Sequence, residues 1–443
     1  MSPEIIISVM FGSLIFAIIV LGAHLGFVLA IIAMAVGLMI WPGSLNVIVL
    51  RVFTIMTNYV IIAVPMFIFM GTMLEKAGFA EDLYAGIDVI FGRMRGGLAV
   101  GTVVLSTAIA MCTGVVAAAI GTAGVMGLGP MLKRGYDKGL TCGCIAAGGT
   151  LGILIPPSVM LIIYAGLTAT SVGQLFLAAF LPGFMLSALF IIYIFIISFL
   201  RPQVAPAASE EVLRQAAATA RGRWMRGLRG IAPIGIIIFA VLGTIIFGIA
   251  TPTEASGTGA FAAILVAAAY RRASWENIRS GALTTVRLMG MMGGVMIGGM
   301  GFSTIFLTSG GGRLIQELLL GAEVAPLMVL AILMGILVLL GCFIGYFAIF
   351  LICLPIFLPI ANAMGWDPIW FALVVCVNLQ MSWLTPPFGY ALFWVRGITD
   401  PKVISFGTII RGCVPFVLLQ ATGLVLCIAF PQIILFLPTL VFR

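Results

Sequence analysis

Long apolar runs alternate with short polar segments along almost the whole chain. A helix needs ~20 apolar residues to cross a bilayer, and most of these runs reach or approach that length. The pattern predicts an all-α polytopic membrane protein. Its simple crossings fall in two groups, at residues 5–21, 25–41, 52–74 and 173–200, and at 230–250, 254–270, about 281–308 and about 407–440.

Two further runs, 139–167 and 370–395, are interrupted by the pairs Pro156-Pro157 and Pro386-Pro387. A proline inside a helix costs ~3 kcal/mol and removes a backbone donor. A backbone group left unpaired in lipid costs more, so such a break persists only where it faces protein or a polar cavity. We therefore predict two broken helices whose interruptions lie inside the protein.

The run 97–131 is apolar but rich in Gly, Ala and Thr, and the run at about 325–360 holds the corresponding place in the second group. We interpret both as re-entrant helical hairpins that enter and leave the membrane on one side. Their tips are expected near Thr113-Gly114 and between Gly341 and Gly345. A single crossing at 97–131 would contradict the charge distribution described below.

Short amphipathic helices are predicted before each hairpin. In residues 78–91, Phe79, Leu83, Ile87 and Ile90 recur at helical spacing with acidic residues between them. This is typical of a helix lying in the membrane interface. A second amphipathic piece runs from Arg313 to Leu320.

A constant offset of 230 residues relates the two groups. Three landmarks share it: Leu154-Ile155-Pro156-Pro157-Ser158 with Leu384-Thr385-Pro386-Pro387-Phe388, Gly135-Tyr136-Asp137 with Gly365-Trp366-Asp367, and Cys112 with Cys342. We predict a first repeat at 1–200, a cytoplasmic linker at 201–229 and a second repeat at 230–443. Five crossings per repeat is an odd number, so the repeats are expected to be inverted. Paired, proline-interrupted segments of this kind indicate the binding site of a transporter.

Basic residues test this topology. With the N-terminus outside, 18 of the 22 Lys and Arg fall in inside segments, Arg287 lies just inside the third predicted crossing of the second repeat, and only Arg51, Arg313 and Arg443 fall outside. This agrees with the positive-inside rule and supports the non-crossing hairpins. The first 50 residues hold no Lys or Arg, so the basic part of a signal peptide is missing and the first run is expected to remain as a crossing.

Composition narrows the function. The chain is 63% hydrophobic and 8% charged, against about 25% charged residues in soluble domains. The net charge of +8 follows topology, so no nucleic-acid partner is expected. No phosphate-binding loop, metal cluster or paired carboxylates are evident, so an enzyme is not expected. The only histidine, His24, is read as a turn residue, with a proton relay as the alternative.

Backbone and hydroxyl oxygens at the helix breaks and hairpin tips are expected to bind ions. Carbonyls and half-helix C-termini can bind a hard cation such as Na⁺. Alternatively, each hydroxyl only donates a hydrogen bond to a carbonyl of its own helix, or its side chain only packs between helices. One predicted Na⁺ site, at the first tip and break, comprises Thr113, Gly114, Gly149, Thr150, Gly152, Pro156 and Ser158. The other, at the second tip and break, comprises Gly341, Gly345, Asn378, Gln380, Ser382, Thr385 and Pro386.

Substrate contacts are predicted at Thr113, Ser158, Tyr346 and Arg396. Arg396 lies nine residues after Pro387, roughly 13 Å along a helix. Reaching for the inner membrane interface is the alternative role of that side chain.

The chain resembles the large membrane subunit of the tripartite ATP-independent periplasmic (TRAP) transporters over nearly its whole length. The resemblance rests on Lys133-Arg134-Gly135-Tyr136-Asp137, on Gly149 to Ser158, on Thr251-Pro252-Thr253-Glu254-Ala255, and on Val377-Asn378-Leu379 leading to Leu384-Thr385-Pro386-Pro387-Phe388-Gly389. In the third of these motifs, Thr251 or Thr253 is predicted to cap a helix together with Glu254.

The resemblance implies a Na⁺-driven importer of a small organic anion, a carboxylate or sulfonate, in the bacterial inner membrane. It implies two partners on separate polypeptides, a small four-helix membrane subunit and a periplasmic substrate-binding protein. It also implies an elevator, in which hairpins and broken helices slide against a scaffold. Where many relatives carry a Ser-rich first tip and an Asp in the second hairpin, this chain has Thr113 to Val116 and Gly345-Tyr346, so its sites are expected to use more backbone oxygens.

Three alternatives remain from the residues. A stand-alone Na⁺/carboxylate symporter of the same inverted-hairpin fold would transport without partners. A channel would conduct measurable currents. A membrane enzyme would need clustered catalytic side chains, which the sequence lacks.

Overall fold

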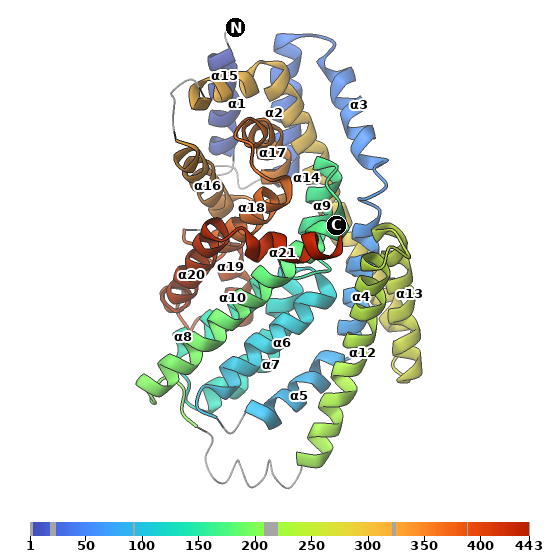
Figure 1. Ribbon diagram of the computed structural model, residues 1–443, viewed down its shortest axis with the longest axis vertical. Helices are drawn as coiled ribbons and strands as arrows, with labels where there is room; N and C mark the ends of the chain where they lie inside the picture. Colours follow the sequence, from blue (N-terminus) through green and yellow to red (C-terminus); the bar gives the residue numbers. More distant parts are fainter. Residues whose placement is uncertain are drawn as a thin grey trace.

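The computed structural model describes residues 3–17, 24–91, 94–207, 220–320, 325–387 and 389–442. All regular structure in these ranges is helical, and seven of the helices are long and apolar enough to cross a membrane. The molecule is elongated, with α15 at one end and α5 at the other (Figure 1). The predicted all-α polytopic class is confirmed.

The helices of the first repeat are α1 (Pro3–Phe16), α2 (Leu25–Ile40), α3 (Ser44–Met56), α4 (Ala63–Lys76), α5 (Phe79–Phe91), α6 (Gly97–Thr113), α7 (Val116–Lys133), α8 (Lys138–Thr150) with the 3-10 turn η2 (Leu151–Ile153), α9 (Val159–Thr168) and α10 (Val172–Leu200). Those of the second repeat are α12 (Ala220–Ile246), α13 (Pro252–Ala269), α14 (Trp275–Thr308), α15 (Gly311–Leu320), α16 (Pro326–Phe343), α17 (Tyr346–Ala363), α18 (Pro368–Ser382), α19 (Tyr390–Ile398), α20 (Phe406–Ala429) and α21 (Gln432–Val441).

The 230-residue offset holds along the whole fold. Helices α7 and α17 begin and end 230 residues apart, and α5/α15, α6/α16 and α9/α19 follow with shifts of one or two residues. The interfacial helices α5 and α15 lie at opposite ends of the body, and the hairpins α6–α7 and α16–α17 approach the centre from those ends (Figure 1). The inverted repeats, both hairpins and both breaks are therefore confirmed.

The two repeats interlock, because helices of each repeat pack on helices of the other. Helix α8 packs on α20 and its counterpart α18 packs on α10; α5 packs on α12 and its counterpart α15 packs on α1. Each half thus completes its core with helices from the other half. This is the arrangement that a two-fold axis between the repeats requires.

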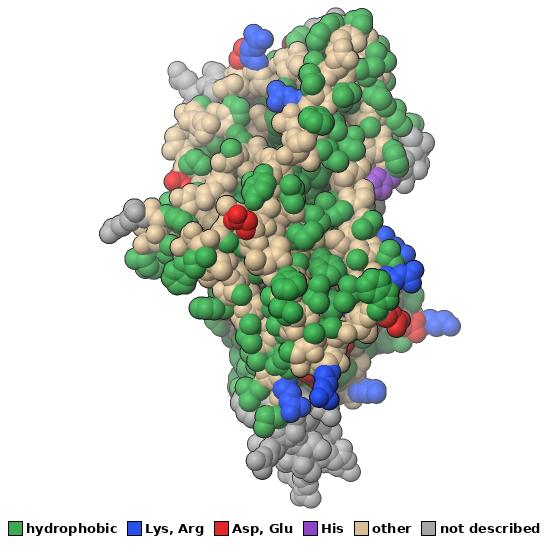
Figure 2. Space-filling view, turned by 90° about the vertical axis from the view of Figure 1, so that its right-hand side faces the viewer, with side chains coloured by type: hydrophobic (Ala, Val, Ile, Leu, Met, Phe, Trp, Pro, Cys, Tyr) green, Lys and Arg blue, Asp and Glu red, His purple; other side chains and the backbone are tan. Residues whose placement is uncertain are grey.

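The outer surface is apolar. Side chains such as Phe27, Phe239 and Phe247 are 69%, 74% and 73% exposed. On the face shown in Figure 2, hydrophobic side chains cover most of the height and most Lys and Arg lie in the lower half. Such a surface is unfavourable in water and suited to lipid.

Three boundaries differ from the prediction. The third crossing, predicted at 52–74, is two helices, because residues 57–62 are irregular. There the Asn58 side chain accepts from the Val60 amide at 2.9 Å and donates to the Gly166 carbonyl at 2.9 Å, so it replaces helical hydrogen bonds.

The last predicted crossing, 407–440, ends at Ala429, and α21 follows after Pro431, which has no amide hydrogen to continue the helix. Helix α12 begins at Ala220, inside the predicted linker 201–229. Residues 208–219 of that linker lie outside the described residues.

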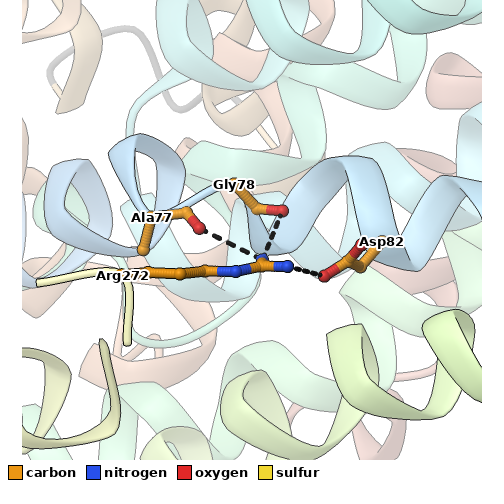
Figure 3. Close-up of polar contacts among 4 residues, drawn as sticks. All are labelled: Ala77, Gly78, Asp82 and Arg272. Carbon is orange, nitrogen blue, oxygen red and sulfur yellow. Dashed lines mark hydrogen bonds and ion pairs between the residues drawn. The ribbon is translucent and has the colours of Figure 1, made fainter. Parts of the chain in front are cut away.

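An arginine clamp, formed by Arg272, holds the connection between α4 and α5, which precedes the first hairpin. Arg272, between α13 and α14, donates to the carbonyls of Ala77 and Gly78 at 3.2 and 3.0 Å and forms an ion pair with Asp82 of α5 (Figure 3). Its guanidinium also lies 5.3 Å from the centre of the Phe79 ring. The clamp satisfies carbonyls at the end of α4 and holds α5, which leads into α6.

Thr251 caps α13 as predicted. Its side chain accepts from the Glu254 amide at 3.3 Å, and the Glu254 carboxylate accepts from the Thr251 amide at 2.7 Å. This reciprocal pairing is a capping box.

Glycines set the crossing of α8 and α20. A methyl group at Gly412 would collide with the carbonyl of Gly139, and one at Gly143 would collide with the carbonyl of Gly412. The two backbones are therefore in direct contact, as small residues permit in membrane proteins.

We predict that Gly412→Ala lowers the free energy of unfolding by about 1–3 kcal/mol, because the added methyl forces the helices apart. Gly407→Ala is the matched control in the same helix, since its methyl would meet only Ser405 Oγ at 3.9 Å. The thermal unfolding midpoint of the purified protein in detergent measures both. Equal midpoints for the two variants would contradict the close crossing.

Candidate functional site

The first hairpin tip lies directly on the first helix break. Helix α6 ends at Thr113, and Gly114 has a φ of 60°, in the left-handed region that favours glycine. A Cβ atom on Gly114 would lie 2.9 Å from the Pro157 carbonyl oxygen and 3.0 Å from the Val159 amide nitrogen. Only a glycine allows this tip to touch the interrupted backbone.

Ser158 joins the two sides of the first break. After α8 the chain makes the turn η2 and then runs irregularly to α9. The Ser158 hydroxyl donates to the Ile153 carbonyl at 2.5 Å and accepts from the Leu161 amide at 3.4 Å. The serine caps α9 and fastens it to the end of η2.

The second break follows Ser382. The chain is irregular over 383–387 and at Gly389, and the Ala391 amide donates across this break to the Trp383 carbonyl at 3.1 Å. The Thr385 hydroxyl donates to the Met381 carbonyl at 2.9 Å. Both prolyl bonds, Pro156-Pro157 and Pro386-Pro387, are cis, and Phe388 lies outside the described residues.

A buried polar cluster lies where the repeats meet. The Thr150 hydroxyl donates to the Ala147 carbonyl at 2.8 Å and accepts from the side-chain amides of Gln380 at 3.3 Å and Gln420 at 3.1 Å. All three polar side chains are fully buried. Thr150 and Gln380 are themselves 230 residues apart, so equivalent positions of the two repeats touch each other, as they do on a two-fold axis.

The same cluster leaves amide oxygens unused. Among the described residues, Gln380 Oε1, Gln420 Oε1 and Asn378 Oδ1 are buried without a hydrogen-bond partner. Asn378 points elsewhere, because its amide nitrogen donates to the Met334 carbonyl of α16 at 2.9 Å. Buried polar groups of this kind are usually paired, so these oxygens are available to an ion or a water molecule.

A cavity of about 340 Å³ lies between the tips, the breaks and α14. Both tips reach it, through Val115 and Gly345, and both breaks reach it, through Ile153 and Trp383. Residues 288–295 of α14 and the ring of His24 complete the wall. One space is therefore shared by both hairpin tips and both proline breaks.

Comparison with known proteins identifies the family. The family model described as "Tripartite ATP-independent periplasmic transporter, DctM component" matches residues 12–433. The chain belongs to this family. As a TRAP large permease it is a multi-pass membrane protein, and membership implies a small membrane subunit and a periplasmic binding protein as partners.

Curated relatives agree over nearly the full length. The C4-dicarboxylate TRAP transporter large permease protein DctM of Pseudomonas aeruginosa is 30% identical over 398 residues, covering 90% of each chain. The sialic acid TRAP transporter large permease protein SiaM of Vibrio cholerae is 28% identical over 421 residues, covering 95% of each chain. The crystal structure of the YdaH transporter of Alcanivorax borkumensis matches with a TM-score of 0.61 at 17% identity, covering 87% of this chain and 88% of that chain, which shows a shared fold.

In this TRAP permease the residues predicted to bind Na⁺ lie in several different parts of the structure. Thr113, Gly114, Pro156 and Ser158 lie at the first tip and break, but Thr150 joins Gln380 of the other predicted set. Methyl groups on Gly149 and Gly152 would point at hairpin α6–α7, against Ile120 and Ala110, so these glycines permit close packing. In the second set Gly341 packs on Ser382, Thr385 and Pro386 lie in the break, and Gly345 faces open space.

Of the predicted substrate residues, Tyr346 lines the cavity. The Thr113 hydroxyl donates to its own helix, to the Ile109 carbonyl at 3.1 Å, and Ser158 is engaged as described above. Arg396 donates to the Ile404 carbonyl at 2.8 Å and so braces the connection from α19 to α20. Sequence reasoning missed His24 and Trp383 as cavity residues, although Trp383 lies just three residues before Pro386.

We predict that Thr150→Val destabilises the permease by about 1–3 kcal/mol, because two buried amides lose their shared acceptor. Thr150→Ser retains the hydroxyl and is expected to stay within about 1 kcal/mol of the wild type. Thermal unfolding in detergent, read by intrinsic fluorescence, compares the two variants. A Val variant as stable as the Ser variant would show that the cluster contributes nothing.

Proposed function

We propose that this permease is the translocating subunit of a Na⁺-coupled importer of a small organic anion. The observation that carries the proposal is the shared cavity, into which both hairpin tips and both helix breaks lead. Half-helix C-termini at α8 and α18 carry partial negative charge suited to a cation. The chain has 14 acidic residues, nearly all outside the predicted crossings, which disfavours coupling through intramembrane carboxylates.

An elevator motion suits the division of the helices. The hairpin α6–α7, helix α16, the broken helices, α10 and α20 pack largely on one another, whereas α2, α4, α13 and α14 form a second group. Helix α17 of the second hairpin lies at the boundary and packs mainly on α14. The cavity lies between the groups, with His24 and α14 on one side and the tips and breaks on the other. Sliding of the first group against the second would carry a solute across while the repeats exchange roles.

The orientation follows from charge. We propose a periplasmic N-terminus, since 18 of 22 basic residues then lie on the cytoplasmic side. The relatives named for C4-dicarboxylates and sialic acid transport chemically different acids. An organic anion is the class common to both.

In proteoliposomes holding the permease, its small membrane subunit and the binding protein, we expect solute uptake to require an inward Na⁺ gradient. Replacing Na⁺ by K⁺ or choline is expected to reduce the rate at least tenfold. Vesicles without the binding protein form a second arm and are expected to show no uptake. Undiminished uptake in choline would exclude sodium coupling, and uptake by this chain alone would favour the stand-alone symporter.

Gly114→Ala is expected to lower Na⁺-dependent uptake at least tenfold, because the methyl group would strike the Pro157 carbonyl and a φ of 60° disfavours alanine. Gly121→Ala is the matched control, since it lies in the same hairpin with no atom within 4 Å of the added carbon. Both proteins must first reach the membrane in equal amounts. Normal uptake by Gly114→Ala would mean that contact between tip and break is not needed for transport.

A further inference from the structure

The cavity wall is unusually apolar for a site that receives an anion. Around the tips and breaks it presents aromatic rings that form one continuous surface. Tyr346 stacks on Phe347 with ring centres 4.7 Å apart, Tyr346 and Trp383 are 5.4 Å apart, and Trp383 and Tyr390 are 5.5 Å apart. The remaining wall is mainly aliphatic, with Val115, Val116, Leu288, Met291, Met292 and Val295.

Charge in the cavity is limited to one side chain. No Asp, Glu, Lys or Arg lines it in the described part of the chain, and its ionisable groups are His24, Tyr346 and Tyr390. Arg396, the cation expected to meet an anion, is engaged with the Ile404 carbonyl instead. His24 is exposed at the start of α2, and its ring nitrogens make no hydrogen bond within the described residues. Its imidazole can offer an N–H to a carboxylate, which no other ionisable group of the wall can.

Trp383 belongs to the same wall, but its indole N–H is buried away from the cavity. Trp383 is 93% buried, and its indole nitrogen has no acceptor among the described residues. By contrast, the indole nitrogen of the similarly buried Trp370 donates to the Cys427 carbonyl at 3.1 Å. Because the Trp383 nitrogen is itself buried, it does not face the cavity, and it offers a ligand there no hydrogen bond.

We infer that the cavity takes a small monoanion with an apolar body, an aromatic or branched aliphatic monocarboxylate, whose carboxylate is held by His24. This inference rests on the proposed function and names its substrate class. A second carboxylate, or the hydroxyl groups of a sugar acid, would lose more water in this wall than its few other polar side-chain groups, such as the Tyr346 and Tyr390 hydroxyls, could replace. That loss disfavours polar bodies strongly, whereas rings and methyl groups gain from burial.

The test uses the purified permease in detergent with NaCl and measures the shift of its thermal unfolding midpoint as each probe is titrated. Phenylacetate is expected to stabilise the protein saturably. Phenylacetamide, its uncharged isostere, is expected to bind at least tenfold more weakly, and succinate and N-acetylneuraminate at least tenfold more weakly still. A midpoint that responds to succinate or N-acetylneuraminate better than to phenylacetate would overturn the inference.

Variants locate the binding. His24→Ala is expected to weaken phenylacetate at least tenfold while leaving the unliganded midpoint near the wild-type value. Gly345→Leu is expected to abolish binding by filling the cavity, because a Cβ atom there meets no atom within 4 Å and the backbone is extended. Gly335→Leu, on α16 and equally unobstructed, is the control and is expected to bind normally. Unchanged binding in Gly345→Leu would place the ligand elsewhere and overturn the inference.

The two proposals fail differently. Na⁺-dependent uptake of a dicarboxylate by the complete system would support sodium-coupled anion import and overturn the apolar substrate class. Binding of phenylacetate that Gly345→Leu abolishes, together with uptake that is indifferent to Na⁺, would support the cavity assignment and refute sodium coupling.

Discussion

Backbone amides and carbonyls cannot be left unpaired in lipid, and this constraint explains why the interrupted segments of this permease lie inside it. Each break is covered by the tip of a hairpin or by a neighbouring helix, and its freed groups find local partners. Ser158 bonds to both sides of the first break, and the Trp383 carbonyl receives the Ala391 amide across the second. The fold therefore has a polar, irregular centre within an apolar, helical shell.

Interlocking of the repeats gives that centre its rigidity. Because α8 packs on α20 and α18 on α10, neither half has a complete core of its own. The backbone contact at Gly139, Gly143 and Gly412 and the hydrogen bonds at Thr150 lie at different points along the same helix α8. The cavity is thus bounded on one side by a unit tied together at several points and on the other by α14.

Much of this architecture could be predicted from the sequence, because proline pairs, glycine-rich tips and a single repeat spacing are local signals. The division at Asn58 was not predicted, since it depends on a bond to Gly166, which lies 108 residues away. The partner of Thr150 was not predicted either, because spacing gives the equivalence of two positions but not their contact. Arg396 was expected near substrate because charge is rare here, yet a nearby loop carbonyl satisfies it.

The contact between Thr150 and Gln380 has an evolutionary consequence. If the two halves descend from a single unit that once paired with its own copy, the residue at this position faced itself across the axis. Among polar side chains, only one that both donates and accepts hydrogen bonds can face itself in a buried place, so hydroxyl and amide residues would have been permitted there and charged ones excluded. Duplication within one chain removed that restriction, because the two positions could then mutate separately. They now hold different residues, Thr150 and Gln380.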